Sequence, residues 1–305
     1  LPMDAQETYD LKRCIALGLE RNFSLIMARN SEKISENNYT AGNAGFLPTL
    51  DLNGGYGGTL NNTSQTSSSG EESSSRGIHN TSGNSSVNLG WTIFRGFHVQ
   101  TTYKKLHELM QIGELSTKLA VEDLAARIAI EYYYYIQQLK LFYNLGYAVS
   151  LSRERVRIDE ERYLLGASSK LQLLQSMVYL NTDSSRYSQQ NQVLKASQVR
   201  LNELMASPDL DEDIILVDSM IQINTGLVYE QLLDEMLRSN TRLQLAASDQ
   251  AVSEYDYRII ASRSYPYLNL YSGYSYAFNE YEEGSLKSQY NSGLNYGLTL
   301  GIDLF

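Results

Sequence analysis

Apolar positions at the start of the chain follow a helical spacing, with one such residue in every three or four. This periodicity predicts helices over Thr8–Glu20 and Phe23–Ala44. Thr8 is the expected N-cap of the first helix, and Asn22 ends or kinks that helix. Pro48 is expected to stop the second helix, because proline has no amide hydrogen to donate.

After Pro48 the apolar positions recur at every second residue, which is typical of strands. Four segments alternate in this way and are the expected strands: residues 50–58, 87–94, 268–278 and 296–305. Residues 59–86 and 279–292 are the expected hairpin loops. The first loop is dominated by Ser, Asn, Thr and Gly, so it cannot bury a core and is expected to be mobile. A linker between domains is the alternative interpretation.

The pattern of helix, proline and strand is duplicated. Shifted by 218 positions, Leu19–Tyr56 lies over Leu237–Tyr274 without a gap, and 12 of the 38 pairs are identical. The identical pairs include Asn22 with Asn240 and Pro48 with Pro266. The returning strands match at an offset of 211, so the first loop is seven residues longer than the second. A repeat of this length predicts two equivalent structural units related by pseudo-symmetry.

Each expected strand has one apolar face and one face of small, uncharged residues. A soluble β-sandwich would also alternate. A membrane barrel is favoured because the polar face lacks the Lys and Glu of a solvated sheet, and because aromatic residues gather at both strand ends. These residues are Tyr274, Tyr276 and Phe278 near the loop, and Phe94 and Phe305 at the far end. The chain has no run of 18 apolar residues, so no transmembrane helix is expected.

Between the two hairpins the sequence predicts long helices. Phe97–Tyr163 contains no proline, and a helix of this length would extend for about 100 Å, which indicates a coiled coil. Gly166 is expected to end this helix, with Ser168 or Ser169 as the N-cap of the next. The next helix is expected over Lys170–Met205. Polar residues interrupt both apolar seams, which a wide, water-filled assembly of paired helices would tolerate.

Composition and charge exclude several classes of function. The net charge is −10, so no domain-wide basic surface is available to bind nucleic acid. The only cysteine, Cys14, lies in a predicted helix and is expected to be buried, and no disulfide within the chain is possible. Leu1–Asp4 lacks the charged and apolar regions of a signal peptide, so no signal peptide is expected at this start.

Several short strings resemble chemical motifs without completing them. His107 begins an HExxH-like string that lacks the second histidine. Gly54–Gly58 has no P-loop lysine or following helix, so its glycines are expected to relieve crowding on a curved wall. The acidic segment Pro208–Thr225 lacks EF-hand spacing and is expected to be a solvated connector. Tyr132–Tyr135 is a candidate ligand-stacking patch, although packing between helices is the default. We therefore expect a non-enzyme, with no metal or cofactor.

The order of these elements resembles the outer-membrane efflux channel family typified by TolC. The resemblance is carried by the repeated helix–Asn–helix–Pro–strand unit, by Phe94-Arg95-Gly96, by the turn Tyr163–Ser168, and by Leu201–Met205 at the end of a long helix. It implies a mixed α and β fold. Long antiparallel coiled-coil helices would form an α-barrel, and four β-strands would contribute to a trimeric twelve-stranded transmembrane β-barrel.

The family layout implies six regions along this chain. They are 1–47, equatorial and first tunnel helices; 48–96, the first β-hairpin with a Ser-rich extracellular loop; 97–206, a long helical hairpin with its periplasmic tip near 163–170; 207–240, an equatorial segment; 241–265, the tunnel helix of the second repeat; and 266–305, the second β-hairpin. In the family a second long helix pair follows the second hairpin, and this sequence stops at Phe305, so we expect it to be truncated.

The resemblance also implies function and sites. It implies a homotrimer in the bacterial outer membrane, with helices in the periplasm, that exports small molecules or proteins passively when docked to a periplasmic adaptor and an inner-membrane pump. The implied sites are Leu165, Gly166, Ala167 and Ser168 at the adaptor-contacting tip, Pro48 and Pro266 at helix-to-strand turns, and Phe94 and Gly96 at a strand-to-helix turn. Gln172 stands where relatives often carry Asp, so no gate ring is assigned.

Two other classes of function remain as alternatives. A structural or adhesive coiled-coil surface protein without transport activity would account for the helices and the Ser-rich segment, but not for the duplicated hairpins. An unrecognised enzyme would depend on His98 or His107, the histidines outside that segment.

Overall fold

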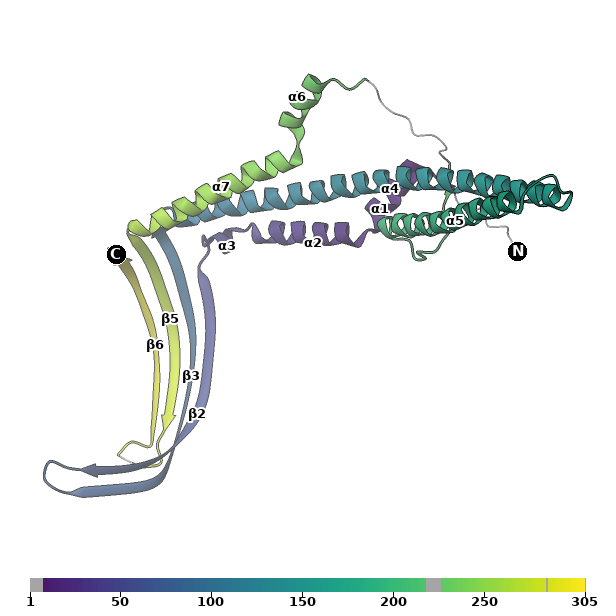
Figure 1. The fold of residues 1–305 in the computed structure, drawn as a ribbon. Coiled ribbons are helices and arrows are strands. Elements are labelled where there is room, and N and C mark those ends of the chain that lie inside the picture. The colour runs from purple at the N-terminus through teal and green to yellow at the C-terminus, as the bar shows by residue number, and fades with distance from the viewer. Residues whose placement is uncertain (1–7, 218–225, 284, 305) are drawn as a thin grey trace, which may run out of the picture. The chain divides into compact units, whose positions relative to one another are not determined.

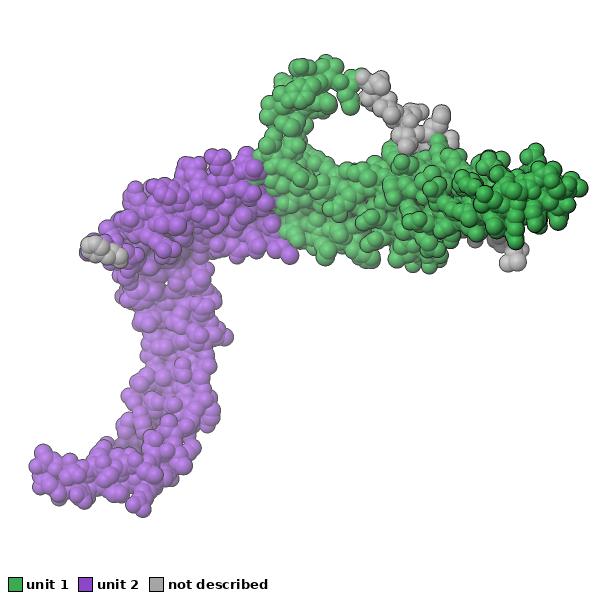
Figure 2. All heavy atoms as spheres, in the orientation of Figure 1, with its two compact units in different colours: residues 1–33, 113–245 green, residues 34–112, 246–305 purple. Residues whose placement is uncertain are grey.

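The structure is a computed structural model that describes residues 8–217, 226–283 and 285–304. The chain divides into two compact units, coloured green and purple in Figure 2. Unit 1 comprises residues 1–33 and 113–245, and unit 2 comprises residues 34–112 and 246–305. The predicted mixed fold class is confirmed, because long helices are combined with four strands of a single sheet.

The helices follow the predicted order (Figure 1). They are α1 Leu11–Arg21, α2 Phe23–Asn38, α3 Ala41–Ala44, α4 His98–Leu164, α5 Lys170–Met205, α6 Tyr229–Ser239 and α7 Thr241–Ala261, followed by a short 3₁₀ helix at Ser262–Ser264. The long helix α4 is displaced by one residue from its expected bounds, and α5 has the expected bounds. Gly166 follows the end of α4 and Ser169 is the N-cap of α5, and these two residues made the helix boundaries predictable.

Two details of the first helices were predicted wrongly. The N-cap of α1 is Asp10, whose carboxylate accepts the backbone N–H of Arg13 at 2.7 Å, and not Thr8. Residues Thr8–Tyr9 form strand β1, which pairs in parallel with β4, Ile215–Leu216. The single helix expected up to Ala44 is also interrupted after Asn38. The interruption has a local cause, since the Thr40 hydroxyl caps a new helix by accepting the N–H of Asn43 at 3.1 Å.

The core of unit 1 is formed by α1, α4 and α5. Cys14, Ile128, Tyr132 and Leu201 have no measurable exposure. Burial, with a smaller contribution from the nearby Asp10 carboxylate, raises the pKa of the Cys14 thiol to about 11, so this predicted buried cysteine is a neutral thiol. The two buried members of the tyrosine run, Tyr132 and Tyr135, pack in the core, as the default interpretation predicted.

The sheet of unit 2 is antiparallel, with the strand order β2-β3-β5-β6 (Figure 1). Its strands are β2 Thr49–Thr66, β3 Glu72–Arg95, β5 Tyr267–Glu280 and β6 Ser288–Gly301. The prediction of a mobile loop at 59–86 is therefore wrong, because strands cover 59–66 and 72–86. The loop expected at 279–292 is likewise shorter, and lies between β5 and β6. Segments of Ser, Thr and Asn form these extra strands, since backbone pairing needs no apolar side chain.

The duplication is present in the helices and strands themselves. Both α1 and α6 contain 11 residues, and each ends at an asparagine with extended backbone, Asn22 at φ −64° and Asn240 at φ −65°. In both copies the asparagine side chain accepts a backbone N–H of the next helix, from Ser24 at 3.0 Å and from Arg242 at 3.0 Å. The same sequence signal therefore builds the same helix–turn–helix connection twice.

Some expectations fall on residues outside those described. They concern Leu1–Asp4, Phe305 and part of the acidic connector, residues 218–225. The described part of the connector is attached to α5 by side-chain amides. Gln198 Nε2 donates to the carbonyl oxygen of Glu212 at 2.7 Å, and Asn202 Nδ2 donates to that of Leu210 at 3.0 Å.

Candidate functional site

The predicted helical tip is a tight connection between α4 and α5. Gly166 has a left-handed backbone, with φ +72°. Its N–H donates to the carbonyl oxygen of Tyr163 at 3.0 Å, and the N–H of Ala167 donates to that of Arg162 at 2.8 Å. These two bonds are the Schellman pattern that ends a helix, and Gly166 fits it because it carries no Cβ. Ser169 then caps α5, with its hydroxyl accepting the N–H of Gln172 at 3.3 Å.

Large apolar side chains are exposed around this connection. The exposed fraction is 83% for Leu165, 77% for Leu164 and 73% for Leu171. The three leucines therefore form an exposed apolar surface at the connection between α4 and α5. The structure places Leu165, Gly166, Ala167 and Ser168 together at this tip, as the sequence predicted.

The residues that precede Pro48 are fixed against the sheet of unit 2. Gly45 closes α3 with φ +90°, and Phe46 follows it. The indole N–H of Trp91 donates to the carbonyl oxygen of Phe46 at 3.0 Å. This bond joins the turn before β2 to the neighbouring strand β3, so that Pro48 stands directly before the first paired residue, Thr49.

Gly96 and the residues before Pro266 meet at one place in unit 2. At Gly96 the backbone is left-handed, with φ +53°, and an added Cβ would stand 2.5 Å from the carbonyl oxygen of Ser262 and 2.6 Å from Tyr265 Cβ. Only glycine fits there. Phe97 also has positive φ, +62°, and its ring meets that of Phe94 edge to face at 5.5 Å. The strand-to-helix turn and the second helix-to-strand turn therefore support each other.

His98 lies at this junction and was not singled out as a site residue. Its Nδ1 is 3.4 Å from Ser262 Oγ, which also donates to the carbonyl oxygen of Ile259 at 2.6 Å. Burial lowers the pKa of His98 below its ordinary value, and the Arg95 guanidinium acts in the same direction. Among these contacts no carboxylate faces the ring, and the Ser262 hydroxyl is committed to the carbonyl oxygen of Ile259, so the geometry is that of a packed turn.

A series of polar pairs connects α4 and α5 in unit 1. Ser197 Oγ donates to Glu131 at 2.6 Å, Gln190 Nε2 donates to Gln138 Oε1 at 2.8 Å, and Ser152 donates to Asp183 at 2.5 Å. The polar positions of the predicted seams therefore pair across the two helices instead of weakening them. Such pairs fix the register of two helices, because each group must find its own partner.

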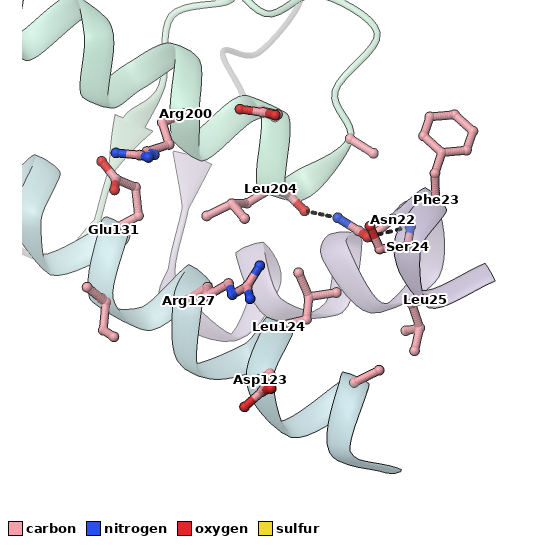
Figure 3. Close-up of a pocket in the computed structure, with 14 residues that line it drawn as sticks. Asn22, Phe23, Ser24, Leu25, Asp123, Leu124, Arg127, Glu131, Arg200 and Leu204 are labelled. Atoms are coloured by element: carbon pink, nitrogen blue, oxygen red, sulfur yellow. Dashed lines mark hydrogen bonds between the residues drawn. The ribbon is translucent and has the colours of Figure 1, made fainter. Parts of the chain in front are cut away.

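An open cavity of about 850 Å³ lies where α2 begins and α5 ends, within unit 1 (Figure 3). The Asn22 amide donates to the carbonyl oxygen of Leu204 at 3.2 Å, which ties the two helix ends together. Arg127, Arg200 and Asp123 line the cavity. Asp123 is engaged with Arg242 at 3.1 Å, so its carboxylate has a structural partner.

The sheet of unit 2 has two chemically different faces. Register pairs place Leu50, Leu52, Leu89, Leu268, Leu270, Leu298 and Leu300 on one face. The other face carries Asn53, Ser86, Asn88, Gly273, Ser275 and Asn295. On the apolar face the exposed fraction is 79% for Leu52 and 75% for Leu300, which is high for leucine in a folded sheet.

Within residues 8–217, 226–283 and 285–304, no three His, Cys, Asp or Glu side chains come together as a metal site. In the same residues, no helix has both the length and the apolar character needed to cross a membrane.

Comparison with known proteins identifies the family. The family profile described as "Outer membrane efflux protein" matches residues 15–207, which is more than half of the chain. The chain belongs to this family. The match covers α1 to α5 except for the first residues of α1, and therefore includes the first hairpin and the helical tip. The family is one of channels and not of enzymes.

Solved structures of outer-membrane channels have the same fold. CmeC, an outer membrane channel of Campylobacter jejuni, has a TM-score of 0.73 at 17% identity, over 97% of this chain and 61% of that chain. CusC, whose structures are described for transmembrane channel formation, has a TM-score of 0.69 at 16% identity, over 97% of this chain and 66% of that chain. VceC, an outer membrane protein of Vibrio cholerae, has a TM-score of 0.67 at 16% identity, over 97% of this chain and 68% of that chain.

The chain thus spans about two thirds of the length of these solved structures. No match was found among curated proteins. The resemblance expected from the order of sequence elements is confirmed by the family match and by these folds.

Proposed function

We propose that the protein is the outer-membrane channel of a tripartite efflux or type I secretion system. Three copies form a tunnel through which small molecules or proteins are exported passively. The observation that carries this proposal is the sheet of unit 2, with one exposed apolar face and one small polar face. Membership of the outer membrane efflux protein family supports it.

Both edges of the sheet support the assembly of several copies. Among the described residues, β2 pairs only with β3 and β6 pairs only with β5, so each has a free edge of backbone donors and acceptors. Long unpaired edges are unfavourable in water and more so in lipid, where closure into a barrel removes them. Four strands from each of three copies would give twelve. In that barrel the apolar face contacts lipid and the polar face lines the lumen.

The remaining predicted sites take their roles from this arrangement. The exposed leucines at the tip, together with Gly166, Ala167 and Ser168, would contact a periplasmic adaptor, which links the tunnel to an inner-membrane pump. Pro48 and Pro266 would mark the passage from periplasmic helix to membrane strand, and Phe94 and Gly96 the return. Transport needs no residue chemistry in this scheme, since the pump supplies the energy.

Two lysine substitutions on neighbouring residues test the proposal. Leu52→Lys places a charge on the apolar face, where it costs about 2–4 kcal/mol at the bilayer midplane, so insertion into liposomes should fall sharply. Asn53→Lys, the matched control on the polar face, should insert like the wild type and change only the conductance measured in planar bilayers. The inserted protein should be trimeric by mass in detergent.

Two results would refute the channel. The first is a wild-type chain that remains a soluble monomer without detergent. The second is a Leu52→Lys variant that inserts and conducts like the wild type, since the apolar face would then not contact lipid.

A further inference from the structure

The outer part of the first hairpin extends beyond the rest of the sheet. Strands β3 and β5 pair as far as Thr81 with Glu280, whereas β2 and β3 continue to Thr66 and Glu72. In β2 the extension contains the eight residues after Gly58, so at about 3.3 Å per residue it is roughly 25 Å long. Among the described strands none besides β2 pairs with this part of β3, so the outer backbone edge of β3 is open to other partners.

The extension bends at a β-bulge. The register of the two strands shifts between Asn61 and Thr63, so Asn62 stands opposite two residues of β3, one of which is Gly77. Gly77 has a left-handed backbone, with φ +73°, and its N–H donates to Asn62 Oδ1 at 2.8 Å. An extra residue of this kind bends a strand and increases its local twist. Figure 1 shows the result, since the outer ends of β2 and β3 turn aside and run past the loop between β5 and β6.

Two carboxylates of the loop between β5 and β6 hold the bent hairpin. Glu282 Oε2 accepts the backbone N–H of His79 at 2.6 Å, on the side of the bulge nearer the sheet. Glu283 Oε1 accepts the hydroxyl of Ser75 at 2.7 Å, on the side of the hairpin tip. His79 lies beyond the last pair of β3 with β5, so the carboxylate takes the place of a strand there. Hydrogen bonds to ionised acceptors are roughly twice as strong as those between neutral groups, so these two bonds hold the strand on both sides of the bend.

The loop contacts the hairpin from the polar face of the sheet. Asn80 pairs with Thr59, and along β3 it shares the face of Ser82 and Ser86, because every second side chain of a strand projects to the same side. Asn80 Oδ1 accepts the backbone N–H of Glu282 at 3.3 Å. The loop that holds the hairpin tip therefore lies over the polar face, which lines the lumen in the proposed channel.

The tip of the hairpin has no apolar side chain that could fix its position. Residues 63–75 consist of Thr, Ser, Gln, Gly and Glu. The burial of apolar surface, which is the main force that holds a segment in a fold, is therefore missing here. The position of the tip depends on hydrogen bonds instead, and those to Glu282 and Glu283 connect it with the second hairpin. The tip can leave this position without exposing apolar surface to water.

We propose that residues 63–75 are a lid over the extracellular mouth of the channel, and that Glu282 and Glu283 are the latch that holds this lid. The inference rests on the proposed channel, in which the polar face of the sheet surrounds the lumen. A segment held over that face narrows the opening. Breaking the two hydrogen bonds of the latch releases the lid and widens the opening, while the pairing of the four strands stays unchanged.

Amide hydrogen exchange tests the latch without requiring conduction. In Glu282→Ala the N–H of His79 loses its acceptor, so in the full chain in detergent this amide should exchange about tenfold faster, or more, than in the wild type. Glu280→Ala is the matched control, because it removes a carboxylate from the same end of β5 but on the other face of the sheet, and it should leave the rate unchanged. Equal exchange of His79 in Glu282→Ala and the wild type would overturn the latch and leave the proposed channel intact.

Single-channel conductance in planar bilayers tests the lid. Glu282→Ala combined with Glu283→Ala releases the tip and should raise the conductance about twofold or more, because a wider opening passes more ions. Glu282→Gln combined with Glu283→Gln removes the same two charges but keeps an acceptor oxygen at each position. This control should therefore conduct like the wild type.

Deletion of residues 63–75 tests the lid without relying on the latch. It leaves Asn62, Arg76 and Gly77 as a three-residue turn between Asn61 and Ile78, which are already paired. The deletion should raise the conductance as much as the double alanine variant does. Wild-type conductance in both of these variants would overturn the lid while leaving the channel intact, and a wild-type chain that does not conduct at all would overturn both.

Discussion

At the scale of single residues, the junction of strand and helix in unit 2 depends on a histidine that must be neutral. Burial and Arg95 lower the pKa of His98, so the folded protein resists a proton that the unfolded chain accepts. Stability should therefore decrease as the pH falls below about 6.5, the ordinary histidine value, and the loss should be complete below the lowered folded-state pKa.

Thermal midpoints in detergent between pH 8 and pH 5 would measure this effect. His98→Gln should flatten the pH dependence, since the side chain no longer titrates. Arg95→Gln should retain part of it, because burial still acts on the ring. Identical slopes in wild type and His98→Gln would show that the junction is not the cause.

Among single residues, glycines and caps were predictable only where the local pattern is complete. Gly166 could be predicted because a turn and a serine cap follow a long helix. Gly96 could be named as a turn residue, but its cause, the close approach of Ser262, comes from a segment 166 positions away. His98 was named only for the alternative of an enzyme, and its packing could not be predicted, since its environment is formed by α7 and the following turn.

At the scale of elements, the helical hairpin of α4 and α5 offers the same substitution in two opposite contexts. Gly166→Ala forces a Cβ into left-handed backbone at φ +72°, and should destabilise the protein by about 1 kcal/mol. Gly146→Ala lies inside the helix, where an added Cβ would meet only the edge of the Tyr187 ring at 3.4 Å. It should stabilise the protein by up to about 1 kcal/mol, because glycine is a poor helix former.

Urea unfolding followed by circular dichroism, with both variants measured beside the wild type, gives the sign of the change in the free energy of unfolding for each substitution. Each variant is the control for the other. Equal effects of the two substitutions would mean that the turn at the tip does not limit the stability of the helical hairpin.

The strands show where sequence patterns reach their limit. Hydrophobic alternation defined residues 50–58 and 87–94, but β2 and β3 extend to Thr66 and back to Glu72. Residues 59–66 of β2 carry a single apolar side chain, Leu60, so no apolar period marks this part of the strand. Ser, Thr and Asn there are held by backbone pairing, which composition does not report. The faces, in contrast, were predictable, because their alternation is set by the pleat.

At the scale of the whole molecule, the order of elements was the most predictable feature, because the repeat was written in the sequence itself. The free edges of β2 and β6 would decide how copies join, because they are the two edge strands of the sheet. In an antiparallel strand, successive residues direct their N–H groups to opposite sides. Of two neighbouring residues in β6, one bonds to β5 and the other faces the open edge.

Proline substitutions at Leu298 and Thr299 separate these two roles. Proline removes one N–H and is tolerated only where that group is unpaired within the chain. The proline that replaces the residue whose N–H bonds to β5 should lower the thermal midpoint of unfolding, because it removes a hydrogen bond within the sheet. The proline that replaces the residue whose N–H faces the open edge should fold normally but lose the trimer, measured by mass in detergent. The edge of β6 can then no longer pair with β2 of another copy. If the variant that folds normally still assembles as the wild type does, β6 is not the joining edge and the twelve-stranded barrel is refuted.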